Sequence, residues 1–448
     1  MLLRKLPYLL SGLALLLGAA AKAQNPLITT QFTADPSARV FNGRVYVYPS
    51  HDILATPGRG RVGWFCMADY HVFSSANLTD WTDHGVIVTQ NQVPWVKPDS
   101  YSMWAPDCIA RNGKYYFYFP STPRDTTDGK GFRVGVAVAD QPTGPFVPQP
   151  LPIRGVHGID PNVFIDRDGQ AYLYWSQGHL YAAKLQPNML ELASAPVTLG
   201  ELPTKGLKEG PYMFERKGIY YLTYPHVANK TERLEYATSP SPLGPFTVRG
   251  VIMDESPTGC WTNHHSITQF RNQWYLFYHH NDLSPQFDKS RSIRLDSLFF
   301  EPDGAIRKVV PTLRGVGLTA ARQKIQVDRY SRLSSRGATI AFLDPANPFL
   351  GWQTLLADSQ GWVQYNGVAF GKQALKAVTL RVRTAAGATV QLRTDGATGP
   401  VLAQVAVPKG SEWQEIKAPL ASFQPGTHAL VVAAKTSAPV AVDWVRFE

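Results

Sequence analysis

Cysteine is scarce in this chain, whose 448 residues include only Cys66, Cys108 and Cys260. An odd number of cysteines without close spacing argues against a disulfide framework and against a cysteine-ligated zinc site. We expect three buried free thiols, with a single disulfide as the alternative.

Charged residues are also few, at 17% of the sequence against 44% hydrophobic residues. This balance supplies enough apolar side chains for a packed core and argues against a disordered chain. The formal net charge is +10, but the basic residues are scattered instead of forming a run. A nucleic-acid partner is therefore disfavoured, whereas attraction to an acidic polysaccharide or a negatively charged envelope stays open.

Long apolar runs are missing except near the amino terminus, at residues 6–21. Arg4 and Lys5 precede this run, and Ala21-Lys22-Ala23 has the small-x-small pattern of a cleavage site. These features predict a signal peptide over residues 1–23 and an exported protein, either periplasmic or secreted. The run is shorter than the roughly 18 apolar residues that a membrane span needs, so we expect no span.

Sustained helical periodicity is lacking as well, and the apolar residues fall in short strands. Aromatic residues reach 12% of the chain, and many lie in a phrase that recurs five times: an apolar strand, a turn centred on Gly or Asn, and an aromatic strand. The phrases begin at Ala34, Ala105, Ile159, Glu209 and His264, with turns at Gly43, Gly113, Gly169, Gly218 and Asn272. A repeat of roughly 50 to 70 residues built from short strands is typical of propeller blades. We therefore predict an all-β chain with a five-bladed β-propeller over residues 25–316.

The aromatic phrases stop before residue 323. Residues 313–322 form a connector to the next part of the chain. Alternating runs such as AVTLRVRT and ATVQLRT come next. Short alternating strands over about 125 residues indicate a β-sandwich. We expect this second domain over residues 323–448.

Three phrases carry a carboxylate at their start, namely Asp35, Asp160 and Glu209, which we read as matching repeat positions. The ordinary interpretation of Asp35-Pro36 and Asp160-Pro161 is a turn. A propeller would instead bring all three acids to one face. A glycosidase needs one protonated carboxyl to donate to the leaving oxygen and one ionised carboxylate on the other side of the bond. A third acid nearby can raise the pKa of the donor by repulsion.

Four stretches resemble the blade signatures of glycoside hydrolase family 43: ADPSARVFNGRVYVYPSHD, HGIDPNVFIDRDGQAYLYW, LKEGPYMFERKGIYYLTYPH and TNHHSITQFRNQWYLFYHH. The resemblance spans roughly residues 25–316. It implies that Asp35 is the general base, Asp160 the pKa modulator and Glu209 the general acid of an inverting reaction. Inversion requires the base and acid carboxyls to stand roughly 6.5–9.5 Å apart, with room for a water.

The same resemblance implies further site residues. His264, in Asn263-His264-His265-Ser266, matches a histidine near a cation on the propeller axis, commonly calcium, whose shell would be mostly water. Arg291 matches an arginine that contacts the sugar and the acid, and Trp104 is expected to form a wall of the sugar pocket. Asp107 and Asp52 are expected to be polar supports without a chemical role. No organic cofactor is needed.

The carboxyl-terminal part resembles carbohydrate-binding module family 6 in IQVDRYSRL, GWVQYNGVAFG and VAVDWVRFE. This implies a jelly-roll sandwich in which aromatic residues, with Tyr365 and Trp413 as candidates, clamp a sugar. Two positions depart from the family: Ala441 stands where Asn is common, and Gln326 replaces a common acid. Sugar binding and a purely structural role therefore both stay open.

Together these features predict a glycosidase that releases xylose or L-arabinofuranose from plant-cell-wall pentosans such as arabinoxylan and xylo-oligosaccharides. An endo- or exo-arabinanase is an alternative within the same family. A retaining fructan hydrolase and a non-catalytic sugar-binding protein are the rivals outside it. Linkage preference, exo or endo action and oligomeric state are not readable from the sequence.

Overall fold

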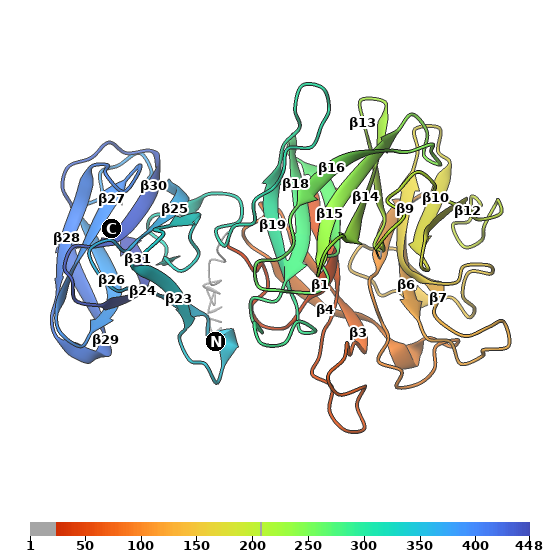
Figure 1. Ribbon diagram of the computed structural model, residues 1–448, viewed down its shortest axis with the longest axis horizontal. Coiled ribbons are helices and arrows are strands. Elements are labelled where there is room, and N and C mark those ends of the chain that lie inside the picture. The colour runs from red at the N-terminus through yellow and green to blue at the C-terminus, as the bar shows by residue number, and fades with distance from the viewer. Residues whose placement is uncertain (1–23, 207) are drawn as a thin grey trace, which may run out of the picture.

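The computed structural model describes residues 24–206 and 208–448, so the predicted signal peptide lies outside the described residues. This part of the chain is all-β: it contains seven β-sheets, and its only helical turns are two 3-10 segments, η1 (Gln90–Gln92) and η2 (Pro348–Leu350). Figure 1 shows five sheets on the right and two larger ones on the left. No helix of the described residues is long and apolar enough to cross a membrane.

The first five sheets are antiparallel meanders in sequence order. Their strands are β1 (Ala34–Phe41), β2 (Arg44–Ser50), β3 (Asp69–Ser75) and β4 (Thr82–Thr89); β5 (Asp107–Arg111), β6 (Lys114–Ser121), β7 (Arg133–Ala139) and β8 (Val147–Pro148); β9 (Ile159–Ile165), β10 (Ala171–Ser176), β11 (Leu180–Lys184) and β12 (Val197–Thr198); β13 (Tyr212–Arg216), β14 (Ile219–Val227), β15 (Glu232–Ser239) and β16 (Thr247–Met253); β17 (His265–Phe270), β18 (Gln273–His280) and β19 (Ser292–Leu298).

Each recurring phrase forms the first hairpin of one of these sheets. The two central turn residues of the first hairpin, Asn42 and Gly43, both have positive φ, as do Arg271 and Asn272 of the fifth. Two successive residues of positive φ give the turn whose twist matches that of paired strands. The sequence repeat is thus a structural repeat.

The first strands of the five sheets contact one another in a cycle, β1 with β5, β5 with β9, β9 with β13, β13 with β17, and β17 with β1. Side chains link these neighbours where no backbone ladder does. Asp107 accepts hydrogen bonds from the Ser37 hydroxyl (2.5 Å) and from the backbone N–H of Val163 (2.7 Å). Asn162 accepts one from the N–H of Met213 (2.9 Å). The cycle therefore draws the five phrase starts to one place.

The last two sheets contain six strands each. One has the order β20-β25-β30-β27-β28, with β22 beside β25, and the other β23-β24-β31-β26-β29, with β21 beside β31. Their strands are β20 (Thr319–Ala320), β21 (Ile325–Gln326), β22 (Arg332–Leu333), β23 (Ala338–Phe342), β24 (Trp352–Leu356), β25 (Trp362–Ala369), β26 (Ala377–Thr384), β27 (Ala388–Thr394), β28 (Val401–Val407), β29 (Gly410–Pro419), β30 (Thr427–Ala434) and β31 (Val440–Phe447). Residues of both sheets form one buried cluster, so the sheets share a core.

The junction between the two parts is tightly bonded. Asn25 donates through Nδ2 to the carbonyl of Thr312 (2.8 Å), and the Arg329 guanidinium donates to the carbonyl of Asn25. Arg314 donates to the carbonyl of Asn366 (2.6 Å), and its guanidinium carbon lies 4.4 Å from the ring centre of Tyr365. The carboxyl-terminal part is therefore anchored to the first five sheets.

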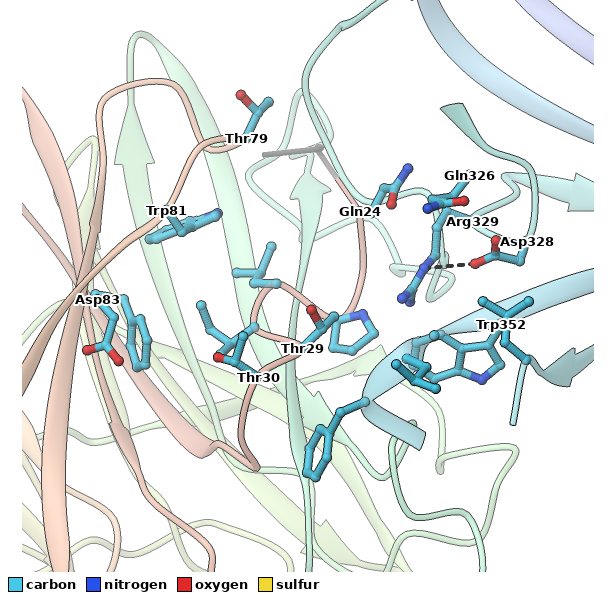
Figure 2. Close-up of a pocket in the computed structure, with 18 residues that line it drawn as sticks. Gln24, Thr29, Thr30, Thr79, Trp81, Asp83, Gln326, Asp328, Arg329 and Trp352 are labelled. Carbon is cyan, nitrogen blue, oxygen red and sulfur yellow. Dashed lines mark ion pairs between the residues drawn. The ribbon is translucent and has the colours of Figure 1, made fainter. Parts of the chain in front are cut away.

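A groove of about 440 Å³ lies beside this junction and is shown in Figure 2. Trp81 lines it from one part, and Trp352 and Phe349 line it from the other. The ion pair between Arg329 and Asp328 (2.9 Å) is the dashed line of Figure 2. The guanidinium of Arg329 also lies 4.0 Å from the ring centre of Trp352. These residues of the carboxyl-terminal part therefore support one another, and the rings of Phe32 and Phe349 meet across the junction at 5.1 Å.

All three cysteines lie in the described part, and each is buried and free, as expected. Cys66 is in the loop after β2, Cys108 is on β5, and Cys260 precedes β17. Burial raises the pKa of the Cys66 thiol and, more strongly, those of Cys108 and Cys260. These thiols are therefore unreactive core residues.

Candidate active site

A pocket of about 100 Å³ opens at the starts of the recurring phrases. Its walls come from the starts of the first strands and the loops before them, from the loop between β2 and β3, and from the loop between β18 and β19. It is lined by Asp35, Trp64, Phe65, Met67, Trp104, Ala105, Ile159, Asp160, Glu209, Trp261, Thr262, His264 and Arg291. All six residues predicted from the sequence, Asp35, Trp104, Asp160, Glu209, His264 and Arg291, are brought together here.

The three acids do not occupy matching repeat positions, which corrects the sequence interpretation. Asp35 and Asp160 do match: each precedes a proline and has positive φ, 46° and 56°. In the fourth phrase the residue before the proline is Gly210, with φ 52°, so Glu209 stands one residue earlier. Only Gly210 adopts this conformation without the penalty that a β-carbon carries.

Asp35 is 5% exposed and is surrounded by donors and positive charge. It accepts hydrogen bonds from Arg291 (2.8 Å) and from the Ser50 hydroxyl (2.6 Å). Burial alone would raise its pKa, but Arg291, His279, His264 and the Ser50 hydrogen bond together lower that pKa to about 2. Asp35 is therefore ionised throughout the physiological pH range.

Arg291 is held in turn by Asp52. The Asp52 carboxylate accepts hydrogen bonds from Nε (2.9 Å), from Nη2 (2.8 Å) and from the backbone N–H (2.8 Å) of Arg291. The face of its guanidinium lies over Phe65, 4.7 Å from the ring centre. Such a two-pronged grip fixes the plane of the guanidinium. Asp52 is thus the polar support that the sequence predicted, and it acts through Arg291.

Asp160 lies between two donors, the Ser176 hydroxyl (2.8 Å) and the backbone N–H of Gly210 (3.0 Å). Burial raises its pKa, although His264 and these hydrogen bonds oppose the rise. The bond to Gly210 ties Asp160 to the residue directly after Glu209. The two acids are therefore positioned together.

Glu209 has a fourth acid beside it, which sequence reasoning missed. Glu232 is 1% exposed, its Oε2 accepts the backbone N–H of Asn263 (2.7 Å), and its negative charge acts on the neighbouring carboxyl of Glu209. Burial, the negative charge of Glu232 and that of Asp160 raise the pKa of Glu209 well above its ordinary value. Burial likewise raises the pKa of Glu232. Because two neighbouring carboxyls do not both ionise readily, the raised pKa of Glu209 keeps this group protonated when Asp35 is ionised.

Aromatic rings form the remaining walls. The ring of Phe65 lies 5.9 Å from that of Trp104 and 6.5 Å from that of Trp261, and Trp64 packs edge-on against Phe65 at 5.4 Å. Trp104 was predicted, whereas Trp64, Phe65 and Trp261 were missed. They lie in loops between the recurring phrases, and no sequence feature other than their aromatic character indicated that they line the pocket. Such rings offer flat apolar faces to a bound molecule.

Other predicted residues have different surroundings. Asp107 lies outside the pocket, where Arg39, Ser37 and Asn162 bond it within the cycle of first strands. Tyr365, a candidate for stacking on a sugar, is 1% exposed and bonded to the Thr319 hydroxyl (2.8 Å), so its ring faces the junction and cannot hold a ligand. Trp413 is half-buried, with the guanidinium groups of Arg381 and Arg383 at 4.8 Å and 4.6 Å from its ring.

An ionised carboxylate and a protonated carboxyl that face one aromatic-walled pocket on an all-β scaffold are the equipment of a glycoside hydrolase. Residues 23–306 match the model of glycosyl hydrolases family 43, and residues 350–448 match that of carbohydrate binding module family 6. The chain belongs to glycosyl hydrolase family 43 and is a glycosidase.

Similar proteins agree with this assignment. A xylosidase/arabinosidase from Humicola insolens is 38% identical over 63% of this chain and 98% of its own length. The solved structure of a family 43 β-xylosidase/α-arabinofuranosidase from a compost microbial metagenome, in complex with xylotriose and calcium-free, has a TM-score of 0.58 and 36% identity over 64% of this chain and 98% of that one. The family 43 arabinoxylan arabinofuranohydrolase of Bacillus subtilis, solved with cellotetraose, covers 96% of this chain and 99% of its own, with a TM-score of 0.55 and 25% identity.

Proposed function

We propose that this protein hydrolyses pentosans such as arabinoxylan and xylo-oligosaccharides with inversion and releases xylose or L-arabinofuranose. The observation that carries the proposal is the opposed pKa shift of two carboxyls in one pocket, Asp35 downward and Glu209 upward. The small pocket, about 100 Å³, suits a single sugar unit at the end of a chain or branch. The activities named for the similar proteins point to the same pentose substrates.

In this proposal Asp35 is the general base, which takes a proton from the attacking water, and Glu209 is the general acid, which protonates the leaving oxygen. Asp160 raises the pKa of Glu209 and is bonded to the backbone next to it. Arg291 and His264 contact the sugar, and Trp104 forms a wall against its apolar face. Water rather than an enzyme nucleophile then bonds to the anomeric carbon, so that carbon inverts.

The proposed architecture is a five-bladed β-propeller over residues 25–316 and then a jelly-roll sandwich over residues 323–448. The cyclic contacts of β1, β5, β9, β13 and β17 support the propeller, and the shared core of the last two sheets supports the sandwich. For the second domain we propose a carbohydrate-binding role with Trp413 in place of Tyr365.

We propose that a calcium ion binds on the axis of the first five sheets. A cavity of about 10 Å³ lies among the first strands, with His264, Asp35 and Asp107 in its lining. Its space is near the lower limit for one water, so a hydrated ion requires it to widen. His264 would face such an ion, which would take most of its oxygen ligands from water. A calcium-dependent rise in the thermal midpoint of wild-type protein, absent from His264→Ala, is the expected result.

We also propose export of the protein through the predicted signal peptide. Edman sequencing of protein recovered from the periplasm or medium should begin near Gln24. Retention of the full amino terminus in the cytoplasm would contradict this proposal.

The anomer of the first-formed product tests the mechanism. NMR of xylotriose hydrolysis, or of an arabinofuranosyl substrate, should show the inverted anomer before mutarotation. Retention would exclude the inverting mechanism and favour the retaining fructan-hydrolase type of chemistry.

A panel of arabinoxylan, arabinan and xylo-oligosaccharides separates xylosidase, arabinofuranosidase and arabinanase activities. No release from any of them would contradict the proposed pentosan substrates.

A further inference from the structure

Two histidines and an aspartate converge where β2 ends and β3 begins in the first sheet, apart from the residues that line the active-site pocket. His51 Nδ1 lies 2.6 Å from Asp69 Oδ1, and His71 Nε2 lies 3.9 Å from the same oxygen. One ligand atom from each of the three residues lies within 4.8 Å of the other two, and all three side chains are partly accessible. The proposed hydrolysis uses none of them.

His71 is oriented by a second carboxylate. Its Nδ1 lies 3.0 Å from Asp83 Oδ1, on the neighbouring strand β4, and that oxygen also accepts the backbone N–H of Gly85 (2.8 Å). A hydrogen bond from Nδ1–H to Asp83 leaves Nε2 of the neutral ring with a lone pair toward Asp69. This lone pair then faces Asp69 Oδ1, which also receives His51, and a cation among the three groups would be stabilised by all of them. A carboxylate behind a histidine is the usual outer support of a metal-bound imidazole.

We propose that His51, Asp69 and His71 form a binding site for a divalent transition-metal ion of the zinc type. Ligands about 2.0–2.1 Å from a tetrahedral zinc stand about 3.3 Å apart. The separations of 2.6 Å and 3.9 Å lie on either side of that value, and all three ligand atoms lie within 4.8 Å of one another. Shifts of about 1–1.5 Å therefore complete the geometry. Two imidazoles and one carboxylate suit zinc and leave its fourth position to water. Calcium prefers oxygen ligands and is not expected here.

The position of the site gives the ion a structural role. His51 and Asp69 stand at the two ends of the loop between β2 and β3, which carries Trp64, Phe65 and Met67 into the pocket. The loop is narrow at its base, where the N–H of Ile53 donates to the carbonyl of Cys66 (2.9 Å). A bound ion would join both ends and order the loop.

The same ion would also act next to the proposed base. His51 lies between Ser50, which donates to Asp35, and Asp52, which holds Arg291. Fixing His51 therefore restrains both neighbours. We expect the ion to affect substrate affinity and loop order more than the chemical step. This part of the inference rests on the proposed function, whereas metal binding itself does not.

The test is zinc binding to chelator-treated full-length protein, measured by calorimetry in two buffers of different ionisation enthalpy. Wild type should bind one zinc ion at this site, with Nδ1 of His51 exchanging its contact with Asp69 for the ion while the ring proton moves to Nε2. His71→Gln should lose this binding step, and Asp83→Asn should weaken it about 10–100-fold. His84→Gln is the matched control, because His84 is on the same strand as Asp83 but bonds Ser74 (2.8 Å) instead. It should bind zinc as wild type does.

Equal zinc affinity in wild type and His71→Gln would overturn the site, as would displacement of the bound zinc by excess calcium. If His71→Gln fails to fold, anomalous diffraction from zinc-soaked wild-type crystals decides. A peak between His51, Asp69 and His71 supports the proposal, and its absence there refutes it. Zinc binding without any glycosidase activity would leave the site standing and contradict only the proposed function.

Discussion

At the scale of single residues, the difference between Asp35 and Glu209 comes from their neighbours. The Arg291 guanidinium is bonded to Asp35, whereas Glu232 and Asp160 are the charged neighbours of Glu209. An opposite charge stabilises the ionised form of a carboxyl, and a like charge stabilises the neutral form. Two acids of nearly equal intrinsic strength are thereby given opposite protonation states.

Glu209→Gln is expected to lower kcat/KM on xylotriose or arabinoxylan by about 10²–10⁴, because the leaving oxygen then receives no proton. The loss should be smaller on nitrophenyl pentosides, whose leaving group needs less protonation. Parallel kinetics on the two substrate classes measure this difference. Activity equal to that of wild type on both would show that Glu209 is not the acid.

Glu232→Gln is expected to move the alkaline limb of the kcat/KM profile to lower pH. The amide removes the negative charge and can donate to ionised Glu209, so the raised pKa of Glu209 falls. Because a raised carboxyl pKa keeps the acid protonated as pH increases, its fall shortens the active range from the alkaline side.

The pH profile of kcat/KM, with unchanged far-UV circular dichroism, is the measurement for Glu232→Gln. Glu215→Gln is the control, since Glu215 pairs with exposed Arg167 outside the pocket (2.5 Å). An alkaline limb that stays in place would mean that Glu232 supports only the packing.

At the scale of elements, the site depends on how each first strand begins. Asp35, Asp160 and Gly210 share a left-handed conformation before a proline, and this bend turns each strand start toward the pocket. Asp tolerates that conformation better than most residues, because its short polar side chain bonds locally. Asp35 and Asp160 adopt this bend themselves and are positioned by it. Glu209 is positioned by the bend at Gly210, the residue after it.

Gly210→Ala is expected to reduce kcat/KM by about 10²-fold, because small displacements at a reacting centre are costly. A β-carbon there would lie 3.0 Å from Pro225 and 3.1 Å from His264, so the pocket must shift. Gly218→Ala is the matched control, with φ +83° and nothing within 4 Å. It should cost about 1 kcal/mol of stability and leave kinetics unchanged. Equal kinetic effects of the two substitutions would contradict this explanation.

At the scale of the whole molecule, the two parts stabilise each other through the amino-terminal segment. Asn25 forms hydrogen bonds with Leu313, Thr312 and Leu295 of the first part. Its carbonyl accepts a hydrogen bond from the Arg329 guanidinium of the second. The chain start is thus held between the parts. This arrangement couples the folding of the catalytic part to the carboxyl-terminal sheets.

A protein ending at Arg322 is expected to keep the pocket but lose roughly 3 kcal/mol of stability, from charged hydrogen bonds and a cation–π contact. Its thermal midpoint should fall, while kcat on nitrophenyl pentosides should be retained. Lys417→Ala in the full chain is the control, because its pair with Glu448 is exposed and far in sequence from the junction. An unchanged thermal midpoint after truncation would show that the junction does not stabilise the catalytic part.

The recurring phrases in the sequence predicted the repeated hairpins, and their starting residues predicted much of the site. Glu209 was assigned the right place but the wrong register, because the residue before Pro211 is Gly210 and not the acid. Glu232 was not predicted, because no local sequence feature distinguishes an acid in a strand as a site residue until its partner is known. Tyr365 was misjudged because an aromatic residue in an alternating strand can face either the core or the junction.

The sequence alone determined the features that depend on local spacing: short strands, tight turns at each phrase, an all-β chain, and the acids that stand at strand starts. The tertiary structure decided which of these acids carries a charge, because a pKa depends on neighbours that lie far away along the chain. Arg291 is 256 residues from Asp35, and their 2.8 Å contact forms only when the first and fifth sheets meet.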